Sequence, residues 1–232
     1  MKLFSALMSL TGVMFLASLF VGYAAISVPE GLNALFGRGN PLYITIMQEI
    51  RLPRTLLAAM IGVSLGLAGA AMQGFLRNPL AEPGLIGVSG SAALGAVIAL
   101  QTGFAATFLL ALPITSLGFA GLAVGLILLL AGPRGSSLTL ILAGIAVSAF
   151  AAALTSLTLN LSPNPYAASE IMFWMMGSVA NRAMSHVWLA LPIMALGWIA
   201  LASLGRGLDA LTLGEDAAEA MGISLSKMRV QL

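Results

Sequence analysis

The residues best suited to chemistry in this sequence form a basic pair and an acidic group. Arg51 and Arg54 stand three apart at the start of an apolar stretch, so in a helix they would project from one face. Their forked guanidinium donors and fixed charge suit bidentate contact with a carboxylate. The same side chains could instead reach lipid phosphate headgroups, so the residues alone leave both partners open.

The acidic group is predicted to lie on a short helix near the end of the chain. Glu215 and Asp216 suit the positive N-terminal end of a helix dipole, and Gly222 could cap the C-terminal end. Glu215 and Glu219 are four apart, so their like charges cost about 0.2–0.5 kcal/mol in an isolated helix, and something should compensate. An opposite apolar face would consist of Leu213, Ala217, Ala220 and Met221. A solvated charged loop is the alternative interpretation.

Residue types needed for catalysis, metal binding or nucleotide hydrolysis are scarce. The sequence has no Cys, a single His at position 186 and two lysines, Lys2 and Lys227. Thiolate nucleophiles and Cys-based metal sites are therefore excluded, and one imidazole cannot form a His-based metal site by itself. Neither lysine ends a Gly-rich phosphate loop, and no Gly-x-Ser-x-Gly motif occurs. We expect no catalytic residue, no cofactor and no metal, and a net charge of +2 gives no reason to expect nucleic acid.

Composition indicates that lipid rather than water surrounds most of the chain. Of 232 residues, 59% are hydrophobic and 8% are charged, whereas soluble domains are about 25% charged. Apolar stretches of about 20 residues can cross a bilayer as helices. Six candidates lie near residues 4–26, 54–75, 84–102, 105–131, 138–160 and 186–204. The sequence therefore predicts an all-α, polytopic transmembrane helix bundle in a single domain over residues 1–232.

The segments between these stretches predict the topology. Residues 27–53 read as an external loop and residues 205–229 as a charged cytoplasmic loop, with the N-terminus on the cytoplasmic side. Three residues, 101–103, separate the third and fourth spans, which predicts a tight helical hairpin. Residues 170–179 read as a short interfacial helix. The first stretch is longer than a signal-peptide core, so we expect a retained span, although a cleaved signal stays open.

Membrane-depth charges are missing from this pattern. No Asp, Glu, Lys or Arg falls in the middle of a predicted span. Ionisable residues at that depth are the usual mark of proton relays and ion coupling. This observation weakens a gradient-driven carrier, so if transport is driven, another chain must supply the energy.

A stiff turn is predicted after the second span. Residues 77–84 combine two prolines, a glycine and three polar side chains. Pro79 and Pro83 lack N–H groups and resist continuation of a helix. A rigid connector between spans explains most of this pattern. Function concentrates in loops, however, so a direct contact with a partner subunit stays open.

Several stretches together resemble one protein family. Residues 51–59 read Arg-Leu-Pro-Arg-Thr-Leu-Leu-Ala-Ala, and residues 69–90 read Gly-Ala-Ala-Met-Gln-Gly-Phe-Leu-Arg-Asn-Pro-Leu-Ala-Glu-Pro-Gly-Leu-Ile-Gly-Val-Ser-Gly. Residues 173–178 (Phe-Trp-Met-Met-Gly-Ser), 213–218 (Leu-Gly-Glu-Asp-Ala-Ala) and 221–223 (Met-Gly-Ile) follow in the same order. They resemble the FecCD/BtuC-like permeases of ATP-binding-cassette importers for iron–siderophore complexes, haem and vitamin B12. Such permeases have about ten spans, so the resemblance covers their first six and the following loop and implies a truncated or split permease.

The resemblance implies roles for particular residues. Arg51 and Arg54 would receive carboxylates of a soluble substrate-binding protein. The acidic segment would be the coupling helix that sits in a cleft of the ATPase subunit, through Leu213, Gly214, Glu215, Asp216, Ala217, Ala218, Met221 and Gly222. The turn that could touch the ATPase comprises Asn78, Pro79, Glu82, Pro83 and Gly84. By family analogy the wall of the pathway includes Ser148, Thr155 and Ser156, although such hydroxyls often bond back to their own helix.

The function implied by the resemblance is that of a permease subunit in a bacterial cytoplasmic membrane. It would work by alternating access, as a homodimer or beside a similar permease, with two ATPases and an external binding protein. The chain itself would not be an enzyme. We expect an iron–siderophore complex as the cargo, with haem and vitamin B12 as alternatives. A non-transporting membrane scaffold or sensor subunit is the rival function from another class.

Overall fold

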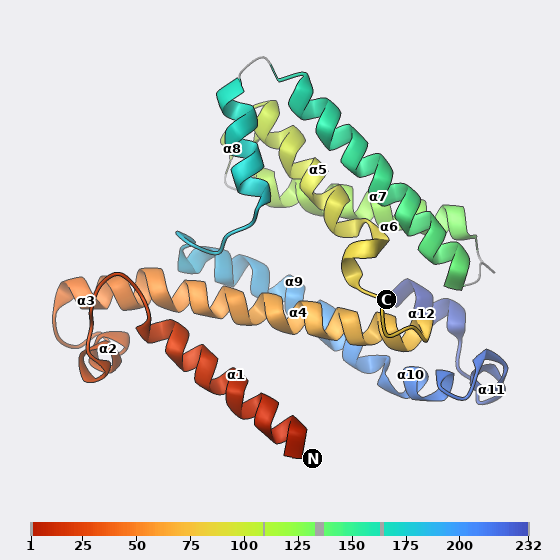
Figure 1. The fold of residues 1–232 in the computed structure, drawn as a ribbon, viewed down its shortest axis with the longest axis horizontal. Helices are drawn as coiled ribbons and strands as arrows, with labels where there is room; N and C mark the ends of the chain where they lie inside the picture. Colours follow the sequence, from red (N-terminus) through yellow and green to blue (C-terminus); the bar gives the residue numbers. More distant parts are fainter. Residues whose placement is uncertain (1, 109, 133–136, 163–164, 232) are drawn as a thin grey trace. The chain divides into compact units, whose positions relative to one another are not determined.

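The computed structural model describes residues 2–108, 110–132, 137–162 and 165–231, and these form two compact units (Figure 1). Unit 1 comprises Met1–Ser64 and Ser178–Ile199, and unit 2 comprises Leu65–Gly177 and Ala200–Leu232. Every regular element in the described ranges is helical. The predicted all-α fold is therefore confirmed.

Unit 1 begins with a long apolar helix and a run of shorter ones. Its elements are α1 (Lys2–Phe20), α2 (Val28–Leu35), α3 (Pro41–Thr45), the π-helical segment η1 (Ile46–Arg51), the first part of α4 (Leu52–Leu76) and most of α9 (Met184–Ser203). The structure thus places helices within residues 27–53, where we expected a loop. A helix starts at Pro41 because the Asn40 side chain accepts a hydrogen bond from the Leu42 N–H at 2.9 Å.

The π-helical segment joins α3 to α4 without a break. Pro53 has no N–H and cannot bond to the carbonyl of Glu49, four residues earlier. The Leu52 N–H instead bonds to the Met47 carbonyl, five residues earlier, which widens the turn. One apolar helical run therefore extends over Pro41–Leu76.

Two clusters of buried side chains hold unit 1 together. The first joins α1 to α2 and η1 and consists of Leu19, Ile26, Ala34 and Met47. The second joins α4 to α9 and consists of Leu57, Met60 and Val187. Next to the second cluster, the Trp198 Nε1–H donates a hydrogen bond to the Ser64 hydroxyl at 2.8 Å.

Unit 2 is a bundle of longer helices followed by three short ones. Its elements are the second part of α4, the 3₁₀ turn η2 (Pro83–Ile86), α5 (Val88–Gln101), the 3₁₀ turn η3 (Phe104–Ala106), α6 (Ala111–Ala131), α7 (Ser137–Asn160), α8 (Pro165–Met175), α10 (Gly205–Leu211), α11 (Glu215–Ala220) and α12 (Leu225–Gln231). Helices α5, α6 and α7 pack on one another. The predicted interfacial helix corresponds to α8, which begins earlier than expected and ends at Met175.

The predicted hairpin of the third and fourth spans is confirmed as α5 and α6. Gly95 lets them approach closely, because a Cβ at this position would lie 2.6 Å from the Thr115 carbonyl oxygen and 2.9 Å from Phe119. The connection is longer than the predicted three residues, since η3 lies between the two helices.

Five helices in the described ranges are long and apolar enough to cross a membrane, namely Lys2–Phe20, Pro41–Leu76, Ala111–Ala131, Leu138–Asn160 and Met184–Ser203. The remaining predicted span, 84–102, contains α5, which has 14 residues and is about 21 Å long at 1.5 Å per residue. It is shortened because Pro83–Ile86 form a 3₁₀ turn and Gly87 adopts a left-handed conformation. A hydrocarbon core is about 30 Å thick, so α5 alone is shorter than a full span.

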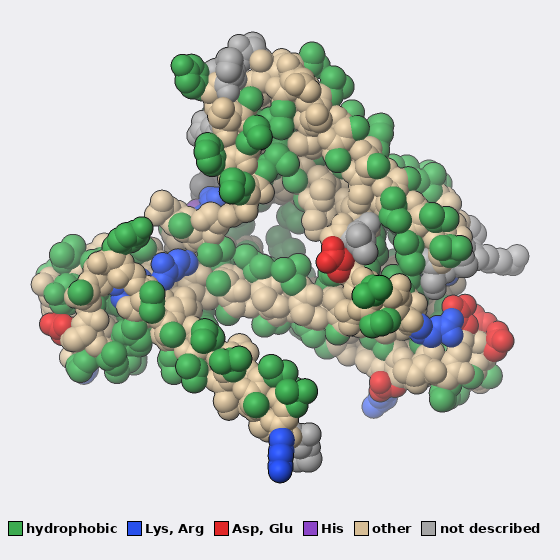
Figure 2. Space-filling model, in the orientation of Figure 1, with side chains coloured by type: hydrophobic (Ala, Val, Ile, Leu, Met, Phe, Trp, Pro, Cys, Tyr) green, Lys and Arg blue, Asp and Glu red, His purple; other side chains and the backbone are tan. Residues whose placement is uncertain are grey.

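Large apolar side chains cover the outer surfaces of these helices (Figure 2). Leu129 of α6 is 77% exposed and Leu196 of α9 is 70% exposed. Large apolar side chains exposed on helices of spanning length are typical of helices that face lipid. The chain is a multi-pass membrane protein.

Candidate functional site

Arg51 and Arg54 bind the C-terminal end of α1. Arg51 Nη1 donates to the carbonyls of Leu19 at 3.2 Å and Phe20 at 2.9 Å, and Arg51 Nη2 donates to the Ala24 carbonyl. The carbonyls in the last turn of a helix have no partner within that helix. The positive charge also suits the negative end of the helix dipole. Arg51 therefore caps α1.

Arg54 contributes to the same cap but remains partly exposed. Its Nη2 donates to the carbonyls of Ser18 at 2.9 Å and Val21 at 3.0 Å. Arg51 is only 3% exposed, whereas Arg54 keeps part of its surface accessible. Sequence reasoning missed these acceptors, because backbone carbonyls have no signature in side-chain patterns. A docking role of the pair stays a prediction, and the accessible member is Arg54.

The turn after α4 is held by backbone and Asn78 hydrogen bonds. Arg77 adopts a left-handed conformation with φ 49°, which ends α4, and the Asn78 N–H bonds to the Gln73 carbonyl at 3.1 Å. The Asn78 side chain then accepts from the Leu80 N–H at 2.9 Å. Pro79 and Glu82 are exposed, Pro83 begins η2, and Gly84 follows within that turn.

Gly87 fixes the far end of this turn on α7. Its φ is 80°, and a Cβ there would lie 2.7 Å from the Ser148 hydroxyl oxygen and 2.8 Å from the Ser148 backbone nitrogen. On the other side of the contact, a Cβ on Gly144 would lie 2.9 Å from the Ile86 Cα. Two glycines thus allow η2 to pack directly against α7. The turn is thus packed against α7, and its predicted stiffness stays a prediction.

The acidic segment forms α11, and both of its predicted helix ends are confirmed. Glu215 and Asp216 lie in its first turn, after Gly214 at the N-cap. Gly222 has φ 84° and its N–H bonds to the Glu219 carbonyl at 2.9 Å. The next N–H, of Ile223, bonds back to the Ala218 carbonyl at 3.0 Å, which completes a Schellman C-cap.

One face of α11 is anchored and the other is open. Ala218 is fully buried, whereas Ala217 is half-buried. Leu213 and Met221, which flank the helix, are 71% and 54% exposed. The segment therefore presents two large apolar side chains next to three exposed acids. Isolated exposed apolar residues are common in proteins, but this pair lies at both ends of one short helix.

An ion pair connects α11 to the turn after α4. Arg77 Nη2 lies 3.3 Å from Glu215 Oε1, and both side chains are about half exposed. Such a surface pair contributes about 0–1 kcal/mol. It also supplies the compensation expected for the like charges of Glu215 and Glu219.

The three α7 hydroxyls of the predicted pathway wall lie in different surroundings. Thr155 is buried and its Oγ1 donates to the Ala151 carbonyl at 2.9 Å, so it bonds back to its own helix. Ser148 lies against Gly87, and Ser156 is exposed. Pathway lining stays a prediction for all three. Within the described ranges, no group of three or more His, Cys, Asp or Glu residues is placed to hold a metal ion.

The chain matches one family of transport proteins over nearly its whole length. The family model described as the FecCD transport family matches residues 10–232. An uncharacterised ABC transporter permease protein of Bacillus subtilis, YvrB, is 38% identical over 88% of this chain and 58% of the relative. The Fe(3+) dicitrate permease FecC of Escherichia coli is 34% identical over 94% of this chain and 67% of the relative. The cobalamin permease BtuC of Halobacterium salinarum is 32% identical over 91% of this chain and 55% of the relative.

A solved structure is similar along the whole chain. It is described as an inward-facing conformation of a metal-chelate type ABC transporter and matches with a TM-score of 0.85 and 30% identity. The match covers 99% of this chain and 70% of that chain. This chain thus spans about 55–70% of the length of these proteins.

Proposed function

This chain belongs to the FecCD transport family, and from that premise we propose that it is a permease subunit of an ATP-binding-cassette importer in a bacterial cytoplasmic membrane. Its N-terminus lies on the cytoplasmic side. It works as a homodimer or beside a similar permease, with two ATPase subunits and an extracytoplasmic binding protein. ATP hydrolysis takes place in the ATPases. The proposal is supported chiefly by the burial pattern of α11 and its flanks: Ala218 is buried in the core, whereas Leu213 and Met221 are exposed.

The ATPase acts on the spans through the core of unit 2. Ala218 belongs to one cluster of buried residues with Ile127 of α6 and Val147 of α7. Because protein interiors are closely packed, a displacement of α11 is transmitted to the helices that share its core. The pair Arg77–Glu215 includes the turn after α4 in the same movement. Closure of the ATPases on ATP would then reorient the spans, which is alternating access.

We propose an iron–siderophore complex as the cargo, with haem and vitamin B12 as alternatives. The relative named for Fe(3+) dicitrate and the metal-chelate transporter support an iron chelate, and the cobalamin relative keeps vitamin B12 open. Proteoliposomes that contain the chain with its ATPase and binding protein should take up a ferric siderophore only when ATP is supplied. Uptake of cobalamin or haem alone would assign that cargo instead. No uptake of any of the three beside an active ATPase would contradict permease function.

Docking of the binding protein is proposed to depend chiefly on Arg54. The substitution Arg54→Gln removes the charge but keeps an amide that can still donate to the end of α1. We expect about tenfold weaker binding of the loaded binding protein to the full transporter, since a charged interface contact is lost. Surface plasmon resonance on nanodisc-embedded transporter measures this affinity.

Arg38→Gln is the matched control, because Arg38 is also exposed in unit 1. It should leave the affinity within about twofold, as expected for a surface charge outside the contact. Equal affinities for the Arg54→Gln variant and the unchanged transporter would remove Arg54 from the docking surface.

A further inference from the structure

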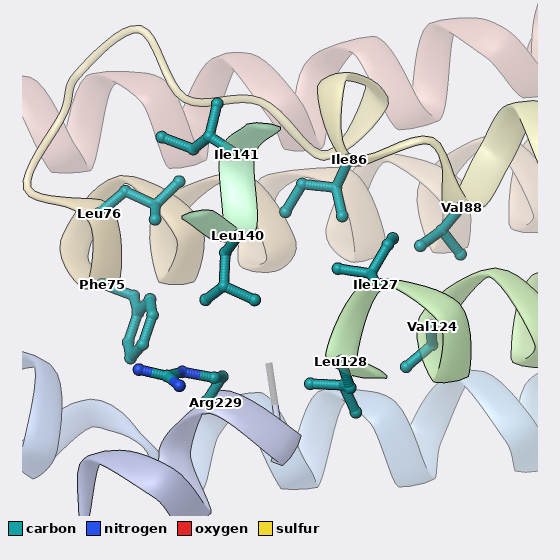
Figure 3. Close-up of a pocket in the computed structure, with 10 residues that line it drawn as sticks. All are labelled: Phe75, Leu76, Ile86, Val88, Val124, Ile127, Leu128, Leu140, Ile141 and Arg229. Atoms are coloured by element: carbon teal, nitrogen blue, oxygen red, sulfur yellow. The ribbon is translucent and has the colours of Figure 1, made fainter. Parts of the chain in front are cut away.

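A pocket in unit 2 combines apolar walls with one cation (Figure 3). Its cavity volume is about 90 Å³, which is below the about 300–1,000 Å³ usual for sites that enclose a whole small molecule, so the pocket can take only part of a larger ligand. Its walls include Phe75 of α4, Ile127 and Leu128 of α6, and Leu140 of α7, and its only charged lining residue among those described is Arg229 of α12. Such a composition suits a ligand with a long apolar part and one anionic group.

Arg229 lacks a partner for part of its guanidinium group. Its Nε and Nη1 atoms are buried, and neither has a hydrogen-bond partner among the described residues. A buried donor without an acceptor is unfavourable, and more so when it carries charge. Figure 3 shows the guanidinium on the same side of the pocket as the Phe75 ring, at the edge of the apolar lining. An anionic oxygen placed there would satisfy the donors and neutralise the charge.

The pocket lies at the ends of apolar helices that are long enough to cross a membrane. Phe75 is in the last turn of α4, Ile127 and Leu128 are near the end of α6 at Ala131, and Leu140 is in the first turn of α7. The ends of membrane-spanning helices are where lipid headgroups meet the hydrocarbon core. A ligand at this depth has acyl chains on one side and phosphate on the other.

We propose that this pocket binds an anionic phospholipid, with the phosphate at Arg229 and one acyl chain along Ile127, Leu128 and Leu140. Basic pockets between membrane helices are known to hold anionic lipid headgroups. A segment of the acyl chain would occupy the pocket between α12 and the ends of α4, α6 and α7. It would thereby stabilise the packing of α12, which follows the coupling segment in the chain.

Native mass spectrometry of the purified chain in detergent tests the proposal, with phosphatidylglycerol, phosphatidylcholine and inorganic phosphate as separate probes. Phosphatidylglycerol should bind about tenfold more tightly than phosphatidylcholine, and Arg229→Gln should abolish that preference. Arg206→Gln, which removes an exposed cation from α10, should retain it. The proposal would be overturned if the Arg229→Gln variant kept the preference of the unchanged chain for phosphatidylglycerol. Displacement of the lipid by inorganic phosphate would overturn it as well.

A second pair of variants tests the acyl site without changing charge. Leu128→Trp fills the pocket and should weaken phosphatidylglycerol binding about tenfold, while Leu129→Trp, next to it but 77% exposed, should not. Circular dichroism checks that both variants keep their helical content. If Leu128→Trp keeps full affinity with its helices intact, the apolar walls do not hold the chain of the lipid and the proposal fails.

Discussion

Leu213→Asp combined with Met221→Asp should strongly reduce stimulation of the partner ATPase by loaded binding protein. Both side chains are largely exposed, so the substitutions leave the core of unit 2 intact. Burial in a cleft of the ATPase would make them the apolar anchors of the contact, and loss of such an anchor costs about 2 kcal/mol or more. Two buried carboxylates would add a desolvation penalty. Stimulation should fall at least about tenfold.

The measurement is the rate of phosphate release by the full transporter in nanodiscs, with and without loaded binding protein. Ser226→Asp is the control, because it adds one such carboxylate at an exposed position on the next helix, α12. It should leave stimulation close to that of the unchanged transporter. Full stimulation in the double variant would show that α11 does not receive the ATPase.

Arg51→Ala should lower the free energy of unfolding by about 3 kcal/mol or more, as expected when several hydrogen bonds to a charged donor are lost. Its guanidinium donates hydrogen bonds to the carbonyls of Leu19, Phe20 and Ala24, so the substitution leaves these three acceptors without this donor. Titration with sodium dodecyl sulfate in mixed micelles, followed by tryptophan fluorescence, measures this stability.

Arg38→Ala serves as the comparison, since Arg38 is exposed and should change stability by less than about 0.5 kcal/mol. If Arg51→Ala is as stable as Arg38→Ala, the cap on α1 contributes nothing. The role of Arg51 would then have to be sought at the outer surface, as the resemblance alone implied.

The long helices and the ends of α11 could be predicted because their signals are local. Helix α7 begins at Ser137 and ends at Asn160, against predicted limits of 138 and 160, since a long apolar run between polar breaks marks a span. Gly222 could be predicted as a cap because a glycine after a short helix favours a left-handed conformation. In both cases the residues that determine the local structure are close together in the sequence.

The partners of the charged residues could not be predicted, because they come from distant parts of the chain. Arg51 bonds to carbonyls about 30 residues earlier in the sequence, and Arg77 meets Glu215 across 138 positions. The helices within 27–53 were missed for another reason. Their polar residues suggested a loop, whereas the Asn40–Pro41 start and the wide turn at η1 allow a helix to continue into α4.

The central claim is that a separate ATPase drives this chain through α11. Cross-linking of position 221 to the ATPase tests this claim most directly. The chain has no native Cys, so Met221→Cys provides a single reactive site, and Leu122→Cys on the exposed face of α6 provides its control. With the partner ATPase co-expressed, we predict that Met221→Cys forms a cross-linked permease–ATPase product and that Leu122→Cys does not. A chain that purifies without the ATPase and gives no such product from Met221→Cys would contradict the account.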